Sequence, residues 1–131
     1  MGTSKLFDHT PFVTLREEVM ALFDRQASHA EIDAKLSEFL NHLEAQFAAE
    51  EQAMQAAGFK PHDAHKTEHD RVLKKLSYRI EQWQKTRDVQ LVLEYIETEL
   101  ADWFVKHVNT RDYITARFLA APQNGPIKPS N

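Results

Sequence analysis

The 131-residue chain contains no cysteine and only three glycines. Without cysteine it can form no disulfide, thiolate metal site or iron–sulfur cluster, and it has no cysteine nucleophile. Any metal ion would therefore be held by histidine and carboxylate side chains. Glycine is scarce and β-branched residues seldom alternate with polar ones, so the sequence has few of the turns and alternating segments that a strand-rich fold requires. These absences favour a helical chain.

The charge balance and the hydrophobic runs exclude further classes of protein. Sixteen Lys and Arg residues stand against 20 Asp and Glu residues, so the net charge is −4 and nothing attracts phosphate. No stretch approaches the roughly 18 consecutive apolar residues of a membrane span. Residues 1–12 lack the basic and apolar pattern of a secretory signal. We therefore expect a cytoplasmic protein with no nucleic-acid or membrane partner.

Helix-forming residues dominate, and four amphipathic segments are separated by short breaks. The expected helices are residues 10–27, 29–57, 64–84 and 89–120. Apolar residues recur at helical spacing in the first three: Phe12, Leu15, Val19, Leu22 and Phe23; Ile32, Leu36, Phe39, Leu40, Leu43 and Phe47; Val72, Leu73, Leu76 and Ile80. Four helices joined by short loops pack most simply as an antiparallel, up-and-down four-helix bundle.

Local signals mark the helix ends. Pro11 suits a first helical turn, and Asp8 is an alternative cap. Ser28 to Glu31 has the form of a capping box, and Gly58 suits the position after a helix. Asp63 is able to cap the third helix. We expect one all-α domain over residues 1–121 and an irregular, proline-containing tail over residues 122–131. The acidic, well-patterned surface gives no strong sign of a buried dimer interface, so we expect a monomer.

Three groups of residues have the spacing of metal ligands. His65 and His69 lie one helical turn apart, where both imidazoles can reach one ion. Glu50 lies beside the apolar stripe of its helix, where an ionised carboxylate is costly unless it is paired or binds metal. His107 and Asp112 are five residues apart, which suits one centre only if the helix contains a π-bulge or loosens locally. Taken alone, the histidine pair and Glu50 each favour a structural role, and the pair His107 and Asp112 is ambiguous. Glu51, next to Glu50, is expected to face solvent.

Together the groups form a pattern that resembles the hemerythrin family, specifically the bacterial hemerythrins. The resemblance covers roughly residues 39 to 113. It is carried by the following runs: Glu50-Glu51-x-x-Met54, Gly58-Phe59, His65-x-x-x-His69 and Trp103-Phe104-x-x-His107-Val108-x-x-x-Asp112.

The resemblance implies an up-and-down four-helix bundle that holds two non-haem iron ions and binds O2, or another small diatomic ligand, reversibly. It implies that His65, His69 and His107 bind the iron whose coordination is complete. It also implies that Glu50 and Asp112 bridge the two irons.

At the second iron the chain departs from the family pattern. His9 is the histidine available from the first helix, but the usual aspartate three residues earlier is replaced by Leu6. The family motif His-Phe-x-x-Glu reads Gln46-Phe47-Ala48-Ala49-Glu50 here. Gln46 can offer a carbonyl oxygen, which is a weaker ligand than imidazole for ferrous iron, or can hydrogen-bond to a water. His42, one turn earlier, either substitutes as a ligand or is a polar core residue.

The expected function is that of an O2-binding di-iron protein, used as a carrier, store or sensor, rather than an enzyme. An apolar pocket that excludes water would be built from Phe47, Trp103, Phe104 and Val108. With Gln46 in place of an imidazole, we expect the second iron to be bound more weakly and to oxidise faster. Two alternatives stay open, namely a di-iron oxidase or peroxidase-like enzyme and a metal-depleted interaction or signalling module. Lys66, Glu68 and Arg111 flank the ligands, but their spacing does not place them.

Overall fold

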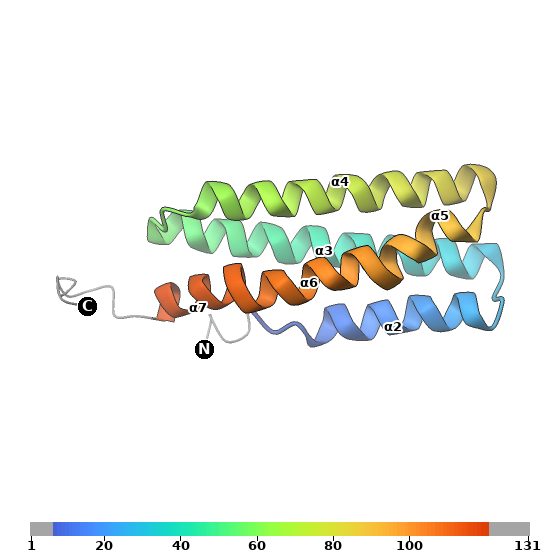
Figure 1. The fold of residues 1–131 in the computed structure, drawn as a ribbon, viewed down its shortest axis with the longest axis horizontal. Helices are drawn as coiled ribbons and strands as arrows, with labels where there is room; N and C mark the ends of the chain where they lie inside the picture. Colours follow the sequence, from blue (N-terminus) through green and yellow to red (C-terminus); the bar gives the residue numbers. More distant parts are fainter. Residues whose placement is uncertain (1–6, 121–131) are drawn as a thin grey trace.

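The computed structural model describes residues 7–120, and four long helical segments lie side by side in it with alternating direction (Figure 1). The first three are α2 (Thr10–Asp24), α3 (His29–Ala57) and α4 (His62–Thr86). The fourth consists of α5 (Val89–Glu94), η1 (Tyr95–Glu99), α6 (Leu100–His107), η2 (Val108–Asp112) and α7 (Tyr113–Ala120). The predicted up-and-down four-helix bundle is confirmed. The expected tail at 122–131 lies outside the described residues.

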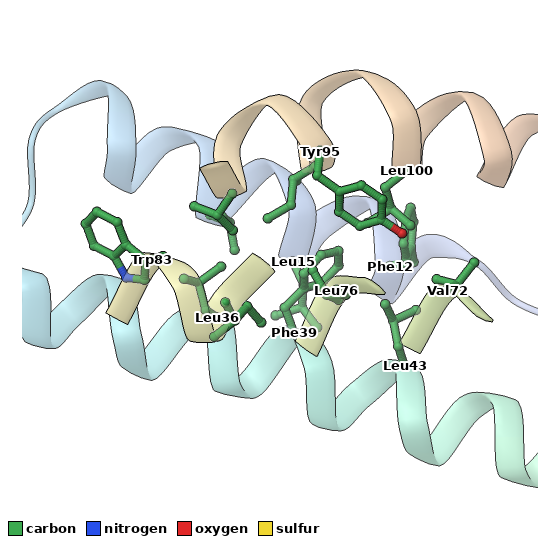
Figure 2. Packing of buried hydrophobic residues seen from close by; sticks show 14 of the residues in the cluster. Phe12, Leu15, Leu36, Phe39, Leu43, Val72, Leu76, Trp83, Tyr95 and Leu100 are labelled. Atoms are coloured by element: carbon green, nitrogen blue, oxygen red, sulfur yellow. The ribbon is translucent and has the colours of Figure 1, made fainter. Parts of the chain in front are cut away.

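The apolar stripes of the four segments meet along the bundle axis (Figure 2). Leu36 and Phe39 of α3, Leu76 of α4, and Ile96 and Leu100 of the fourth segment have no exposed surface. Each such side chain contributes roughly 1.5–3 kcal/mol by leaving water. The stripes predicted for α2 and α3 supply much of this core. None of the described helices has the length and apolar character to cross a membrane.

The helix ends follow local chemistry. The Ser28 hydroxyl accepts a hydrogen bond from the Glu31 N–H at 3.1 Å, and the Glu31 carboxylate accepts one from the Ser28 N–H at 3.3 Å, as the capping box predicts. Gly58 ends α3 with a φ of 70°, a backbone conformation that glycine adopts without strain.

Three predicted boundaries are shifted, and one of them is the end of α4, which lies at Thr86 rather than near residue 84. α2 ends at Asp24 rather than near residue 27, because Gln26 takes a left-handed φ of 53° and the Ala27 N–H returns to the Leu22 carbonyl. α4 begins at His62, two residues early, so Asp63 lies in its first turn and does not cap it. Asp8 does accept a hydrogen bond from the Thr10 N–H at 3.0 Å, while α2 begins at Thr10.

At the end of the bundle opposite the α3–α4 turn, the carboxylate of Asp33 accepts hydrogen bonds from two other side chains. The indole N–H of Trp83 donates to Asp33 at 2.8 Å, and two guanidinium nitrogens of Arg87 donate to the same carboxylate at 2.8 and 3.0 Å. Despite partial burial, the hydrogen bonds from Arg87 lower the pKa of Asp33. This contact ties α3 to the turn between α4 and α5, so the long helices stay in register toward the other end.

The fourth segment is interrupted by two π-helical stretches. In η1 the side chain of Arg16, from α2, donates to the carbonyls of Ile96 and Glu97 at 3.1 and 3.0 Å. These bonds satisfy backbone acceptors that the wider turn leaves over. η2 begins directly after His107 and ends at Asp112. It is the irregularity that the five-residue spacing of these two side chains requires.

Removing a core side chain far along the bundle from His65, His69 and His107 tests this packing. We expect Leu36→Ala to lower the free energy of unfolding of the metal-free protein by about 2–5 kcal/mol, because the side chain is fully buried and leaves a cavity. The exposed Val105→Ala, as a control, is expected to change it by less than about 0.5 kcal/mol. Urea denaturation followed by circular dichroism measures both. Equal effects of the two substitutions would contradict the described core.

Candidate metal centre

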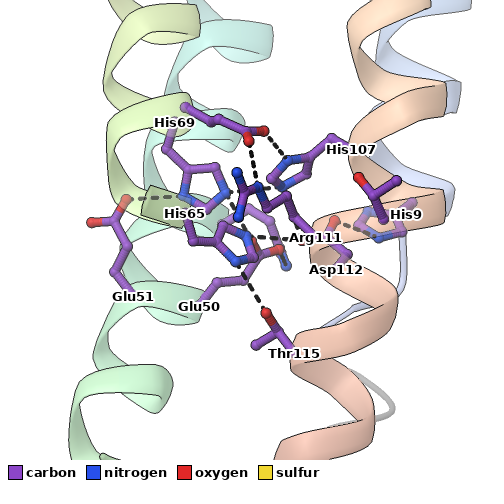
Figure 3. Close-up of polar contacts among 12 residues, drawn as sticks. His9, Glu50, Glu51, His65, His69, His107, Arg111, Asp112 and Thr115 are labelled. Atoms are coloured by element: carbon purple, nitrogen blue, oxygen red, sulfur yellow. Dashed lines mark hydrogen bonds and ion pairs between the residues drawn. The ribbon is translucent and has the colours of Figure 1, made fainter. Parts of the chain in front are cut away.

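Five ionisable side chains converge inside the bundle near the end where α3 turns into α4 (Figure 3). They are Glu50, His65, His69, His107 and Asp112, and none is more than 3% exposed. Each residue offers one ligand atom, and these atoms all lie within 4.8 Å of one another.

Each residue reaches the cluster for a local reason. His65 and His69 project from the same face of α4, one turn apart. Glu50 continues the buried stripe of α3. The π-helical η2 adds one residue to a turn, which brings His107 and Asp112 to the same side of the fourth segment. In a regular α-helix, five residues correspond to about 500° of rotation, so the two side chains would diverge.

The Nε2 atoms of the histidines face one oxygen of each carboxylate. The Nε2 of His107 lies 2.9 Å from Oδ1 of Asp112, and the Nε2 of His65 lies 3.0 Å from the same oxygen. The Nε2 of His69 lies 3.2 Å from Oε1 of Glu50. Three imidazole nitrogens and two carboxylate oxygens therefore surround a single point, and such a donor set suits Fe, Zn or another first-row ion.

The hydrogen bonding of these atoms is incomplete without a cation. Among the described residues, Oε1 of Glu50, Nε2 of His65 and Oδ1 of Asp112 are buried and have no hydrogen-bond partner of acceptable geometry. Close approach without hydrogen bonding is the arrangement of ligand atoms whose lone pairs aim at a common centre. Unsatisfied buried polar atoms are costly, and a metal ion would satisfy all three. The residues present therefore fit a metal.

Burial and neighbouring side chains shift the pKa values within the cluster. Burial, with the neighbouring Asp112 carboxylate, raises the pKa of Glu50 to about 7. For Asp112 burial acts upward, but the close approach of the imidazoles of His107, His65 and His9 outweighs it and lowers the pKa. Burial lowers the pKa of His69 to about 4, which keeps its imidazole neutral. His69 is thus kept as the neutral imidazole and Asp112 as the ionised carboxylate, the forms that bind metal, whereas the raised pKa of Glu50 opposes ionisation until a cation is present.

Two of the histidines are held from behind by carboxylates. The Nδ1 of His69 lies 2.9 Å from Glu51, and the Nδ1 of His107 lies 2.9 Å from Glu68. The guanidinium of Arg111 donates to the other oxygen of Glu68 at 2.6 Å. Such contacts orient an imidazole and direct its Nε2 lone pair inward. Glu51 was expected to face solvent, and that expectation is wrong because its oxygen reaches His69.

The third histidine has a different partner. The Nδ1 of His65 lies 3.1 Å from the hydroxyl of Thr115 in α7, and both residues are buried. Thr115 carries no spacing signal that links it to His65, since 50 residues separate the two. Lys66, which flanks the pair in sequence, instead forms an exposed ion pair with Asp70 at 2.8 Å.

The second oxygen of each carboxylate faces away from the three histidines. Oδ2 of Asp112 lies 3.2 Å from Nε2 of His9, which directly precedes α2. Oε2 of Glu50 accepts a hydrogen bond from the side-chain amide of Gln46 at 2.9 Å. The two carboxylates thus separate a three-histidine side from a side formed by His9 and Gln46.

A narrow pocket opens on the side of His9 and Gln46. Its apolar walls are Phe12, Leu43, Phe47, Trp103 and Phe104. Of the residues expected in this pocket, Val108 is half-buried and does not line it, whereas Phe12 and Leu43 were missed by the sequence analysis. Both belong to the general core stripes, so nothing in their spacing distinguishes them. His42 also lines the pocket.

On this side, one aromatic ring stacks on each of two imidazoles. Phe47 stacks on His69 with ring centres 3.8 Å apart and planes 5° apart. Trp103 stacks on His107 at 4.4 Å and 19°. Together with the contacts to Nδ1, this stacking fixes both the direction and the tilt of the two rings.

Comparison with known proteins shows which proteins this chain is similar to. The chain is 35% identical over 119 residues to a bacteriohemerythrin of Ralstonia nicotianae, covering 91% of this chain and 80% of the relative. It is 31% identical over 87 residues to a bacteriohemerythrin of Aquifex aeolicus, covering 66% of each chain. No family model and no solved structure matches it. The extent of the first relationship, on a four-helix bundle with a buried histidine and carboxylate cluster, shows that the chain belongs to the hemerythrin family.

Proposed function

We propose that the chain binds dioxygen reversibly at a carboxylate-bridged pair of non-haem iron ions. One observation carries the proposal: Glu50 and Asp112 each direct one oxygen toward the three histidines and the other toward the side of His9 and Gln46. A carboxylate with two such neighbourhoods is suited to bridge two metal ions. The kinship with bacteriohemerythrins supports iron as the metal.

In this proposal His65, His69 and His107 hold the first iron, and His9 with Gln46 or a solvent molecule holds the second. Glu50 and Asp112 bind both. The iron pair, when bound, supplies the electrons for reversible binding of dioxygen.

The chain's own residues supply the setting. Phe12, Phe47 and Phe104 keep bulk water out of the pocket, which limits protonation and loss of a reduced ligand. The narrowness of the pocket favours a small diatomic ligand. We further propose that the protein acts as a carrier, store or sensor, as a monomer in the cytoplasm.

A second candidate function is a di-iron oxidase or peroxidase-like activity. It is favoured by His42, whose imidazole lines the otherwise mostly apolar pocket. An imidazole there can transfer protons during the reduction of hydrogen peroxide to water, with an external reductant supplying the electrons. A metal-depleted interaction module is a third candidate, which metal content alone distinguishes.

Metal content and the optical spectrum test the main proposal. We expect anaerobically purified protein to bind two ferrous ions per chain and to develop a visible band in air that disappears when oxygen is removed. The variant His107→Ala, which lacks a first-iron ligand, is expected to show no band. Catalytic oxygen consumption with added reductant would favour the oxidase candidate instead. Fewer than two irons together with no band would contradict oxygen binding.

The contact between Glu68 and His107 is expected to set metal affinity. We expect Glu68→Gln to weaken binding of the first metal ion about 10- to 100-fold, because the amide orients the imidazole without the negative charge that raises its basicity. Competition against a chelator of known affinity measures the loss. Asp70→Asn on the same helix, which removes only an exposed ion pair, is the matched control. Equal affinities of the two variants would show that Glu68 does not act through His107.

The glutamine at position 46 is expected to speed oxidation of the iron. We expect Gln46→His to oxidise in air at least about tenfold more slowly than the natural chain, since imidazole binds ferrous iron more tightly than an amide oxygen or water. Stopped-flow absorbance of the ferrous protein mixed with air-saturated buffer follows the reaction. An unchanged oxidation rate in a variant that holds two irons would remove Gln46 from the explanation.

A further inference from the structure

We propose that the side-chain amide of Gln46 is a two-position switch that makes the chain load metal in two separate steps. With only the three-histidine position filled, the Gln46 N–H holds the inner carboxylate Glu50. When a second ion enters, the amide turns and presents its carbonyl oxygen to that ion. This inference rests on the proposed function, because it assumes a metal position on each side of the carboxylates.

The first observation is the hydrogen bond itself. The Nε2 of Gln46 donates to Oε2 of Glu50 at 2.9 Å, one turn along α3. Glu50 is 1% exposed, so this donor compensates an oxygen that water does not reach. An amide N–H keeps its proton at ordinary pH, so as long as this bond persists it takes one lone pair of the oxygen that a second metal ion would use and keeps the amide carbonyl turned away from that oxygen.

A glutamine can fill both roles without breaking a covalent bond. Its amide carries a donor and an acceptor on the same carbon atom, and a rotation of about 180° about the last side-chain bond exchanges them. The donor satisfies Glu50 in the absence of a second ion, and the acceptor satisfies a second ion when one is present. Neither state leaves the buried carboxylate without a partner.

The second observation is the unequal support of the two sides. Each histidine of the first side is held at Nδ1 by Glu51, Glu68 or Thr115. Among the described residues, no hydrogen bond holds the Nδ1 of His9, whose side chain is 20% exposed at the start of α2. The first position is therefore preorganised, whereas the second must gather its ligands when the ion arrives.

The two observations together give the one-metal form a defined structure. Oxygen binding needs both ions, so it becomes conditional on the supply of free ferrous iron. The first ion remains bound when iron is scarce, and the second reports on its concentration. An imidazole at position 46 would not act as such a switch, because a rotation of about 180° about its last side-chain bond puts a ring carbon, and not the other nitrogen, in the place of each nitrogen.

Anaerobic titration of the metal-free protein with ferrous ion, followed by calorimetry, tests the loading order. We expect two resolved steps, the second at least about 100-fold weaker than the first. In Gln46→His the second step is expected to tighten about tenfold or more while the first is unchanged. Gln52→His, which adds a histidine at an exposed position of the same helix, is the matched control and is expected to behave like the natural chain.

Nuclear magnetic resonance with zinc, which is diamagnetic, follows the amide directly. The side-chain NH2 signals of Gln46 are assigned by their loss in Gln46→His. We expect one proton to be shifted downfield and protected from exchange in the metal-free and one-zinc forms, and this protection to vanish when a second equivalent binds. Protection that is unchanged by the second equivalent would overturn the switch.

The outcomes separate this inference from the proposed function. Two ferrous ions bound in a single unresolved step would overturn stepwise loading and leave a di-iron oxygen-binding protein intact. Two steps that are identical in Gln46→His would overturn the role of Gln46. A natural chain that binds no ferrous ion at all would overturn the proposed function itself.

Discussion

Burial of five ionisable side chains within a helical bundle is the constraint on which the rest of the structure depends. Glu50, His65, His69, His107 and Asp112 leave water almost completely, and such burial is tolerated only when charges are paired or bind metal. Their mutual contacts reduce the cost but leave buried atoms without hydrogen bonds. A bound cation would therefore stabilise the folded protein. The apolar core along the remaining length of the bundle supplies the stability that the cluster alone does not.

The fold accommodates this cluster by departing from helical regularity at one place. A regular α-helix cannot aim His107 and Asp112 at the same point, and η2 does so by widening one stretch. The cost of the wider turn falls next to the candidate metal ligands, where binding of a metal ion would offset it. The distant η1 carries no ligand, and there Arg16 compensates the freed carbonyls instead. The same backbone defect is thus stabilised in two different ways within one segment.

Sequence reasoning succeeded where a single periodicity or a local motif decides the outcome. The bundle, the capping box at Ser28 and the turn at Gly58 follow from apolar spacing and backbone chemistry. It failed where the deciding contact joins distant segments. Thr115 and Glu51 reach histidines that lie 50 and 18 residues away in the chain, and no local pattern marks either contact. The end of α2 was also misplaced, because Gln26 adopts a left-handed backbone conformation although it is not a glycine.

The two sides of the centre differ for a reason that lies in the helices. The histidines of the first side come from α4 and the fourth segment, and α3, α4 and α7 each supply a partner for the Nδ1 of one of them. The second side depends on His9, which precedes α2, and on Gln46, which is already engaged with Glu50. A ligand at the end of a helix and a ligand with a competing hydrogen bond both lower affinity without changing the fold. In the proposed two-metal centre, substitutions at these two positions would therefore alter the second site with little effect on the first, because neither His9 nor Gln46 belongs to the apolar core.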